Sequence, residues 1–327
     1  MHSRFVLSIL LAGFCNAAEP SAFPEAQISN GSITAKLLLP DAERGYYRGT
    51  RFDWSGVIQS LRTADHEYFG QWFPKYDPKL HDAIMGPVEE FSTNDMGLGY
   101  AEAKPGESFI RIGVGAVRKP DEPKYERFKT YEIVDHGKWS TGKGKDWIEF
   151  TQDLKDHNGY AYRYTKRIEL AKGKPVMTIH HTLKNNGTKP IETQQYNHNF
   201  FMLDGEPTGP GASVQFPFEL RPVRPLPPEM ARVEGSKISY VSELKTGQSV
   251  HTELEGFGKE ASDYDIRVEN AKSGAGVRIQ GDRPITKLIY WSIRTTLCPE
   301  AYITLNIAPG RESKWTYTYT FYDTRKQ

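Results

Sequence analysis

A histidine set between two amides and beside two large aromatic side chains is the first feature of this sequence that could do chemistry. The segment Asn197-His198-Asn199-Phe200-Phe201 follows the strand-like run 193–196. Such surroundings can hold an imidazole in one orientation while it exchanges a proton near neutral pH. His198 is therefore a candidate general acid, and the alternative is a buried histidine bonded to backbone groups.

A lone carboxylate far along the chain is the natural partner. Glu300 stands in the apolar and aromatic run Leu297-Cys298-Pro299-Glu300-Ala301-Tyr302. Partial burial would raise its pKa and make it a better base near neutrality, whereas a surface glutamate at a strand edge would do no chemistry. Together, His198 and Glu300 are predicted to be an acid–base pair of the kind that moves protons on a sugar.

Several other residues have side chains suited to binding a sugar. Arg51 and Asp53 would share one face of a strand and could bond hydroxyls, or could simply pair with each other. Trp54 could stack on a pyranose, as could Trp291 and Tyr302, although aromatic residues more often pack a core. His81-Asp82, followed by the segment 86–91 with its two adjacent glutamates, is a weaker site candidate, and Asn197 flanks His198.

The elements that position these residues are predicted to be strands. Alternation with a period of two places Tyr160, Tyr162, Tyr164, Lys166 and Ile168 on one strand face. The runs 177–183 and 316–322 alternate in the same way, and turn signals such as 171–175, 184–190 and 273–276 separate the runs. The proline-rich stretch 221–228 is expected to be a long surface loop. No segment has convincing helical periodicity, so one large all-β domain of antiparallel strands over residues 19–327 is predicted.

The first residues are expected to be a signal peptide, residues 1–18, that is removed on export. A positive residue, a short apolar run and small residues at 16–18 fit that pattern. Cys298 would then be the only cysteine left, which excludes an intramolecular disulfide and a thiolate metal site. The expected location is periplasmic or secreted.

The overall composition limits the partners. Forty-two basic and 41 acidic residues nearly cancel, so no global field would draw the chain to nucleic acid or to anionic membranes. His180 and His181 would point to opposite strand faces and could not bind one metal together. No metal-ligand spacing, cofactor motif or membrane-spanning segment follows residue 18, and we expect none of these. The oligomeric state is left open.

The chain also resembles the galactose mutarotase-like (aldose 1-epimerase) family. The segment 197–201 is similar to that family's Asn-His-x-Tyr/Phe-Phe segment, Glu300 to its C-terminal glutamate, and 308–312 to the Pro-Gly-Glu turn before its last strand. This resemblance implies a large antiparallel β-supersandwich, with His198 as the catalytic acid and Glu300 as the base. The family's first histidine, in a His-Gly-Gly segment, has no clear counterpart; residues 109–115 occupy that region. Arg51 or Arg111 could stand in for the family's arginine.

Three functions follow from these features. The first is an exported mutarotase-like enzyme that interconverts the anomers of a mono- or oligosaccharide without a cofactor. The second is a carbohydrate-binding protein of the same fold without chemistry, which the missing His-Gly-Gly segment favours. The third is a lyase or hydrolase acting on an acidic polysaccharide, in which Arg48, Arg51 and Arg111 would face a uronate carboxylate.

Overall fold

The computed structural model describes residues 22–326. The expected signal peptide lies outside these residues. Within them, the regular structure consists of strands and three short 3-10 turns, η1 (Leu203–Gly205), η2 (Ala261–Asp263) and η3 (Thr324–Lys326). No helix in this part of the chain is long and apolar enough to cross a bilayer. The prediction of an all-β fold is confirmed.

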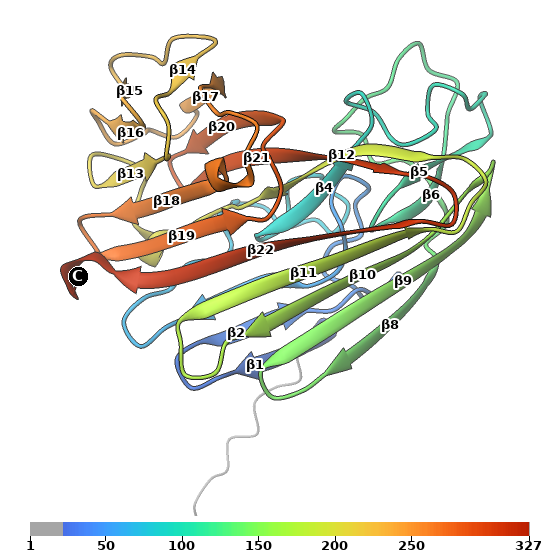
Figure 1. Cartoon of the computed structure of the whole chain (residues 1–327), viewed down its shortest axis with the longest axis horizontal. Coiled ribbons are helices and arrows are strands. Elements are labelled where there is room, and N and C mark those ends of the chain that lie inside the picture. Colours follow the sequence, from blue (N-terminus) through green and yellow to red (C-terminus); the bar gives the residue numbers. More distant parts are fainter. Residues whose placement is uncertain (1–21, 327) are drawn as a thin grey trace, which may run out of the picture.

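Two large sheets dominate the molecule, and their neighbouring strands pair antiparallel. The ten-stranded sheet contains, in spatial order, β15 (Ala231–Glu234), β16 (Lys237–Tyr240), β13 (Ala212–Gln215), β18 (Asp265–Asn270), β19 (Ala275–Gly281), β22 (Glu312–Asp323), β11 (Val176–Asn185), β10 (Tyr160–Leu170), β9 (Trp147–His157) and β8 (Lys138–Lys143). The six-stranded sheet contains β14 (Arg221–Pro222), β17 (Ser249–Glu255), β20 (Lys287–Ile293), β21 (Thr296–Ile307), β12 (Ile191–His198) and β4 (Val88–Ser92). In Figure 1 the long strands β22, β11, β10, β9 and β8 run side by side across the lower part of the view.

Two smaller sheets complete the fold. They are formed by β1 (Glu25–Ser29), β2 (Thr34–Leu38) and β3 (Val57–Arg62), and by β5 (Ser108–Arg111), β6 (Gly115–Arg118) and β7 (Ile133–Asp135). The stretch 221–228 is not wholly a loop, because β14 pairs with β17 at the edge of the six-stranded sheet. An edge position is where a proline can enter a ladder without losing a required hydrogen bond.

The two large sheets pack face to face, with side chains alternating along each strand as predicted. On β10, Tyr162, Tyr164 and Lys166 are buried, while Arg163 between them is exposed. Tyr317 and Tyr319 of β22 reach across the interior: the Tyr317 hydroxyl donates to Gln195 Oε1 (2.6 Å). Buried aromatic and aliphatic side chains of both sheets form one continuous core between them.

A buried ionic cluster also joins the sheets. Lys166 of β10 donates to Glu89 of β4 and lies 3.8 Å from Asp53, and His181 Nε2 lies 2.8 Å from the other oxygen of Glu89. Tyr164 donates to Asp53 Oδ2 (3.1 Å). Burial raises the pKa of Asp53 to about 7, although the Lys166 ammonium opposes that rise.

A second apolar core lies between the other face of the six-stranded sheet and the loops that cover it. Its members include Phe52, Trp54, Trp72, Phe200 and Cys298. Because side chains of a strand alternate between faces, one set of β12 and β21 residues enters the inter-sheet core and the other set faces these loops.

Replacing Lys166 with methionine tests the ionic cluster. The variant would leave two carboxylates buried without their ammonium, so we expect unfolding to become easier by about 3–5 kcal/mol. Urea denaturation followed by tryptophan fluorescence measures this. Arg163→Gln, which removes an exposed ion pair one position upstream of Tyr164, should leave the midpoint unchanged. Equal midpoints for wild type and Lys166→Met would contradict the role of the cluster.

Candidate active site

His198 and Glu300 meet across a strand pair. The antiparallel register of β12 and β21 pairs Gln195 with Ile303, and the same register recurs at the bridge between Phe201 and Leu297. This register places His198 directly opposite Glu300, where side chains of neighbouring strands touch. His198 Nε2 lies 3.3 Å from Glu300 Oε1, and both side chains are buried.

These two residues line a cavity of about 160 Å³ on the loop-covered face of the six-stranded sheet. The cavity is lined by Arg51, Asp82, Arg127, Phe128, His198, Phe200, His251, Ile289, Trp291 and Glu300. Ile289 pairs with Glu300, and His251 pairs with Trp291, so β17, β20, β21 and β12 each contribute a wall or floor residue. The arginines and Asp82 come from the covering loops, outside the strands.

The imidazole of His198 is held by aromatic rings. It stacks on Phe200 with centroids 3.8 Å apart and planes 9° apart, and it meets Phe52 and Trp291 edge-on at 5.7 and 5.5 Å. Phe200 has a φ of 43°, a left-handed conformation that a bulky residue rarely adopts. This turn of the backbone just beyond β12 brings the two rings together, and such strain is common at functional sites.

Close packing of the backbone at Gly86 against Asn199 also fixes the turn after β12. A Cβ atom on Gly86 would come within 2.4 Å of the carbonyl oxygen of Asn199. Asn199 itself donates to the carbonyl of Pro299 (2.7 Å), and the Phe200 amide donates to Cys298 Sγ (3.2 Å). These contacts tie the histidine segment to the glutamate segment.

A carboxylate surrounded by three arginines lies under the cavity. Glu90 accepts two hydrogen bonds from Arg127, at 3.0 and 2.9 Å, and one from Arg51 at 2.9 Å. Arg111 lies 3.5 Å away, and the Tyr196 hydroxyl donates to Glu90 at 2.6 Å. Although burial alone would raise the pKa of Glu90, the guanidinium groups hold it well below its usual range, so this carboxyl is ionised.

The acid–base pair is in a different electrostatic state. Burial lowers the pKa of His198 well below its ordinary value, and the nearby Arg51 guanidinium lowers it further. Burial raises the pKa of Glu300 to about 8, partly opposed by Arg51 and Arg127. At neutral pH the pair therefore holds one proton. Burial favours the state with this proton on Glu300, because both buried side chains are then uncharged.

The structure brings together some of the residues predicted from sequence. Arg51 and Trp291 line the cavity beside His198 and Glu300. His81 lies at its margin, 3.0 Å from Asp82 and stacked on Phe128. Tyr302 lies beneath the pair, stacked on Tyr196 with its hydroxyl 3.5 Å from Glu300.

Other predicted residues are placed elsewhere. Asn197 points into the inter-sheet core and donates to Tyr319, because it is one residue out of phase with His198. Arg111 is buried and donates to the carbonyls of Thr50 and Arg51, so it supports the site from outside the cavity. Trp54 is buried and donates to the Gly49 carbonyl.

The expectation that Arg51 and Asp53 share a strand face is wrong. Residues 51–54 form no strand, and the two side chains diverge. Arg51 turns to Glu90 and the cavity, whereas Asp53 joins the buried ionic cluster. Hydrogen bonds to Ser55 and Tyr164 occupy the Asp53 carboxylate.

Sequence reasoning missed Arg127, Phe128 and His251, and it included Glu90 only in the weaker candidate formed by His81-Asp82 and residues 86–91. The adjacent glutamates Glu89 and Glu90 of the apolar strand β4 were a usable signal. Their side chains point to opposite faces of a buried strand, so each needs a buried partner on its own face. Arg127 and Phe128 lie in an irregular loop, where no periodic pattern indicates a role.

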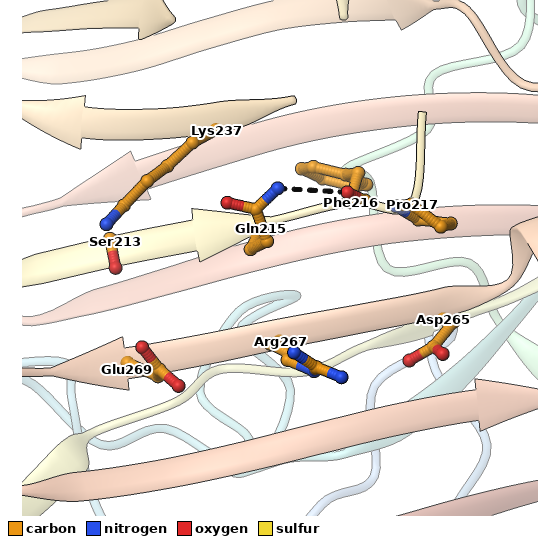
Figure 2. A pocket seen from close by; sticks show the side chains of 8 residues that line it. All are labelled: Ser213, Gln215, Phe216, Pro217, Lys237, Asp265, Arg267 and Glu269. Atoms are coloured by element: carbon orange, nitrogen blue, oxygen red, sulfur yellow. Dashed lines mark hydrogen bonds between the residues drawn. The ribbon is translucent and has the colours of Figure 1, made fainter. Parts of the chain in front are cut away.

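A larger depression lies on the outer face of the ten-stranded sheet, between β13, β16 and β18 (Figure 2). It has a volume of about 430 Å³, and its two carboxylates are already bonded: Asp265 to Arg278 and Glu269 to Tyr322. Gln215 Nε2 donates to the neighbouring Phe216 carbonyl. Its lining residues include no histidine, so we assign the chemistry to the cavity at His198. No group of three potential metal-binding side chains is found in residues 22–326.

Comparisons with known proteins agree with this fold. No protein-family model matches the chain, and no curated protein has a significantly similar sequence. Among solved structures, the chain is similar to a protein from Synechocystis sp. PCC 6803 (TM-score 0.57, 10% identity, 95% of this chain and 100% of that chain). It is also similar to an aldose epimerase homologue from C. elegans (TM-score 0.55, 12% identity, 91% and 98%) and to a galactose mutarotase-like protein from Lactobacillus casei (TM-score 0.52, 12% identity, 91% and 100%). The chain therefore has the galactose mutarotase-like fold.

Proposed function

We propose that this protein is a mutarotase of the aldose 1-epimerase type, in which His198 and Glu300 exchange one proton with a sugar. The observation that carries the proposal is their 3.3 Å approach in a buried cavity, from opposing positions of two strands. The fold shared with aldose epimerase homologues supports it. A cavity of about 160 Å³ is smaller than the usual range for drug-sized ligands, which favours one sugar unit over a polymer.

The reaction needs one base and one acid. The unprotonated member of the pair takes the proton from the anomeric hydroxyl while the protonated member gives one to the ring oxygen. The bond from C1 to the ring oxygen breaks, and C1 becomes a carbonyl carbon. Rotation about the C1–C2 bond and closure with the roles reversed give the other anomer and restore the pair.

The directions of the two pKa shifts indicate which residue is the base and which is the acid when the ring opens. The sequence predicted Glu300 as the base and His198 as the acid. Because burial keeps the shared proton on Glu300 at neutral pH, we assign His198 as the base in the opening step and Glu300 as the acid. The reverse assignment applies to closure, so both residues are needed in both directions.

A carbohydrate-binding protein without chemistry is the second candidate. It is favoured by the absence of a segment resembling the family's His-Gly-Gly motif in residues 109–115. It predicts that changes at His198 and Glu300 alter sugar affinity alone.

Glutamine at either position distinguishes the two. We expect Glu300→Gln and His198→Gln each to lower the rate of anomer exchange by roughly 10²- to 10⁴-fold, because each removes one proton-transfer group. The rate is followed by one-dimensional NMR of the anomeric protons of freshly dissolved aldoses and sugar acids. Glu192→Gln, an exposed change on β12, is the matched control and should retain the full rate. Rates equal to wild type in all three variants would contradict the assignment.

The pH profile tests the shared proton. Above pH 8 Glu300 loses its proton, and the pair then has a base but no acid. We therefore expect kcat/KM to fall roughly tenfold per pH unit on the alkaline side, with an apparent pKa near 8. A second fall is expected in acid, where His198 gains a proton, at a pH well below the ordinary pKa of histidine.

The control for that profile is Glu300→Gln. Its residual rate should have no alkaline limb near pH 8, since glutamine does not titrate. A wild-type rate that rises steadily through this range would show that Glu300 does not act in its protonated form.

A further inference from the structure

The charges around the cavity do not cancel. Arg51 and Arg127 line it and Arg111 lies just beneath, against the two ionised carboxylates of Asp82 and Glu90. His198 and Glu300 together hold one proton and are neutral as a pair. Three positive against two negative groups leave an excess of one positive charge in a partly enclosed, low-dielectric space, where charge is felt more strongly than in water.

Arg127 has capacity to bind a further group. A guanidinium has five N–H donors. The hydrogen bonds to Glu90 and Tyr196 use Nε and Nη2, and the guanidinium also bonds the Tyr302 hydroxyl, so one of the five N–H groups is left for a ligand. The Arg127 side chain keeps 28% of its exposure, whereas Arg51 keeps 7% and Glu90 none. It is thus a partly open cation held in place by a buried carboxylate.

A fourth arginine lies next to the strand that carries the cavity residue His251. Arg224, in the loop after β14, shares two backbone hydrogen bonds with the hydroxyl of Thr252, the neighbour of His251. Burial lowers the pKa of His251, and the Arg224 and Arg127 guanidinium groups lower it further. The Arg224 side chain has no ion-pair partner among residues 22–326 and is exposed. Phe128 is 55% exposed, and the Cζ atoms of Arg51 and Arg127 lie 4.9 and 5.9 Å from the centroid of its ring.

We propose that the substrate is an anionic monosaccharide, a uronate or a sugar phosphate, whose charged group binds Arg127 while its anomeric centre lies against His198 and Glu300. This inference rests on the proposed function for the chemistry at the anomeric carbon. The excess positive charge of the arginines around the cavity supports the negative charge of the substrate. A planar guanidinium presents parallel N–H groups that match carboxylate and phosphate oxygens. Arg224 would attract the anion to the mouth, and a neutral aldose would leave the excess charge without a counterion.

The experiment compares charged and neutral sugars at fixed ionic strength. Anomer exchange is followed by NMR for glucuronate, glucose 6-phosphate and glucose, and affinity is measured separately by calorimetry. We expect at least one anionic sugar to exceed glucose by roughly ten- to a hundredfold in kcat/KM, as for a hydrogen-bonded charge pair. The anionic sugar that gives the larger ratio identifies whether the group is a carboxylate or a phosphate.

Variants at Arg127 separate recognition from damage. Arg127→Gln should reduce the ratio of anionic to neutral kcat/KM about tenfold or more, and Arg127→Lys, which keeps the charge but loses the fork, should give an intermediate ratio. Arg163→Gln, which removes a guanidinium paired with a carboxylate on the outer face, is the matched control and should leave the ratio unchanged. A fall in both rates by the same factor in Arg127→Gln would mean that this arginine only supports Glu90, and would overturn the proposal.

The results also separate this inference from the proposed function. Tight, Arg127-dependent binding of an anionic sugar with no exchange would support anion recognition and refute the mutarotase. Exchange of glucose as fast as that of both anionic sugars would support the mutarotase and refute the anionic substrate. The absence of exchange and binding for all three sugars would overturn both.

Discussion

The register between β12 and β21 is the constraint on which the site depends. It sets His198 opposite Glu300 and, two residues along each strand, stacks Tyr196 on Tyr302. A shift of one residue would turn every one of these side chains to the other face. The register is secured on that other face, where Gln195 and Asn197 bond the tyrosines of β22. The inter-sheet core therefore fixes the geometry of a cavity that it does not touch.

Strand β4 places one buried, ionised glutamate on each of its two faces. On β4, Glu89 faces Lys166 and His181 between the sheets, and Glu90 faces three arginines under the cavity. Both glutamates stay ionised because cations replace the water they lose. Glu300 lacks such direct partners, so burial dominates and its proton is retained. The contrast between Glu90 and Glu300 gives the site one fixed negative charge and one transferable proton.

The strands and the acid–base pair could be predicted from the sequence, whereas the arginines around Glu90 and the positions of Asp53 and Asn197 could not. Alternation predicted the strands, and the histidine and glutamate segments predicted a pair that the structure places 3.3 Å apart. The arginine cage could not be predicted, because Arg127 comes from an irregular loop whose position depends on contacts distant in sequence. Asp53 lies away from the cavity because the chain turns at residues 51–54 and does not continue as a strand. Asn197 shows that proximity in sequence to a site residue can mean the opposite face of the sheet.

The protonation state of Glu300 decides which member of the pair is the acid, and NMR can observe it directly. Glutamate side-chain carboxyl carbons are labelled with ¹³C, and the Glu300 signal is assigned as the one missing from Glu300→Gln. A titration through the neutral range is then recorded without any sugar. We expect this signal to titrate near pH 8, while His198 remains unprotonated below neutrality. A Glu300 signal that titrates near the ordinary value of 4.5, beside a protonated His198, would contradict it.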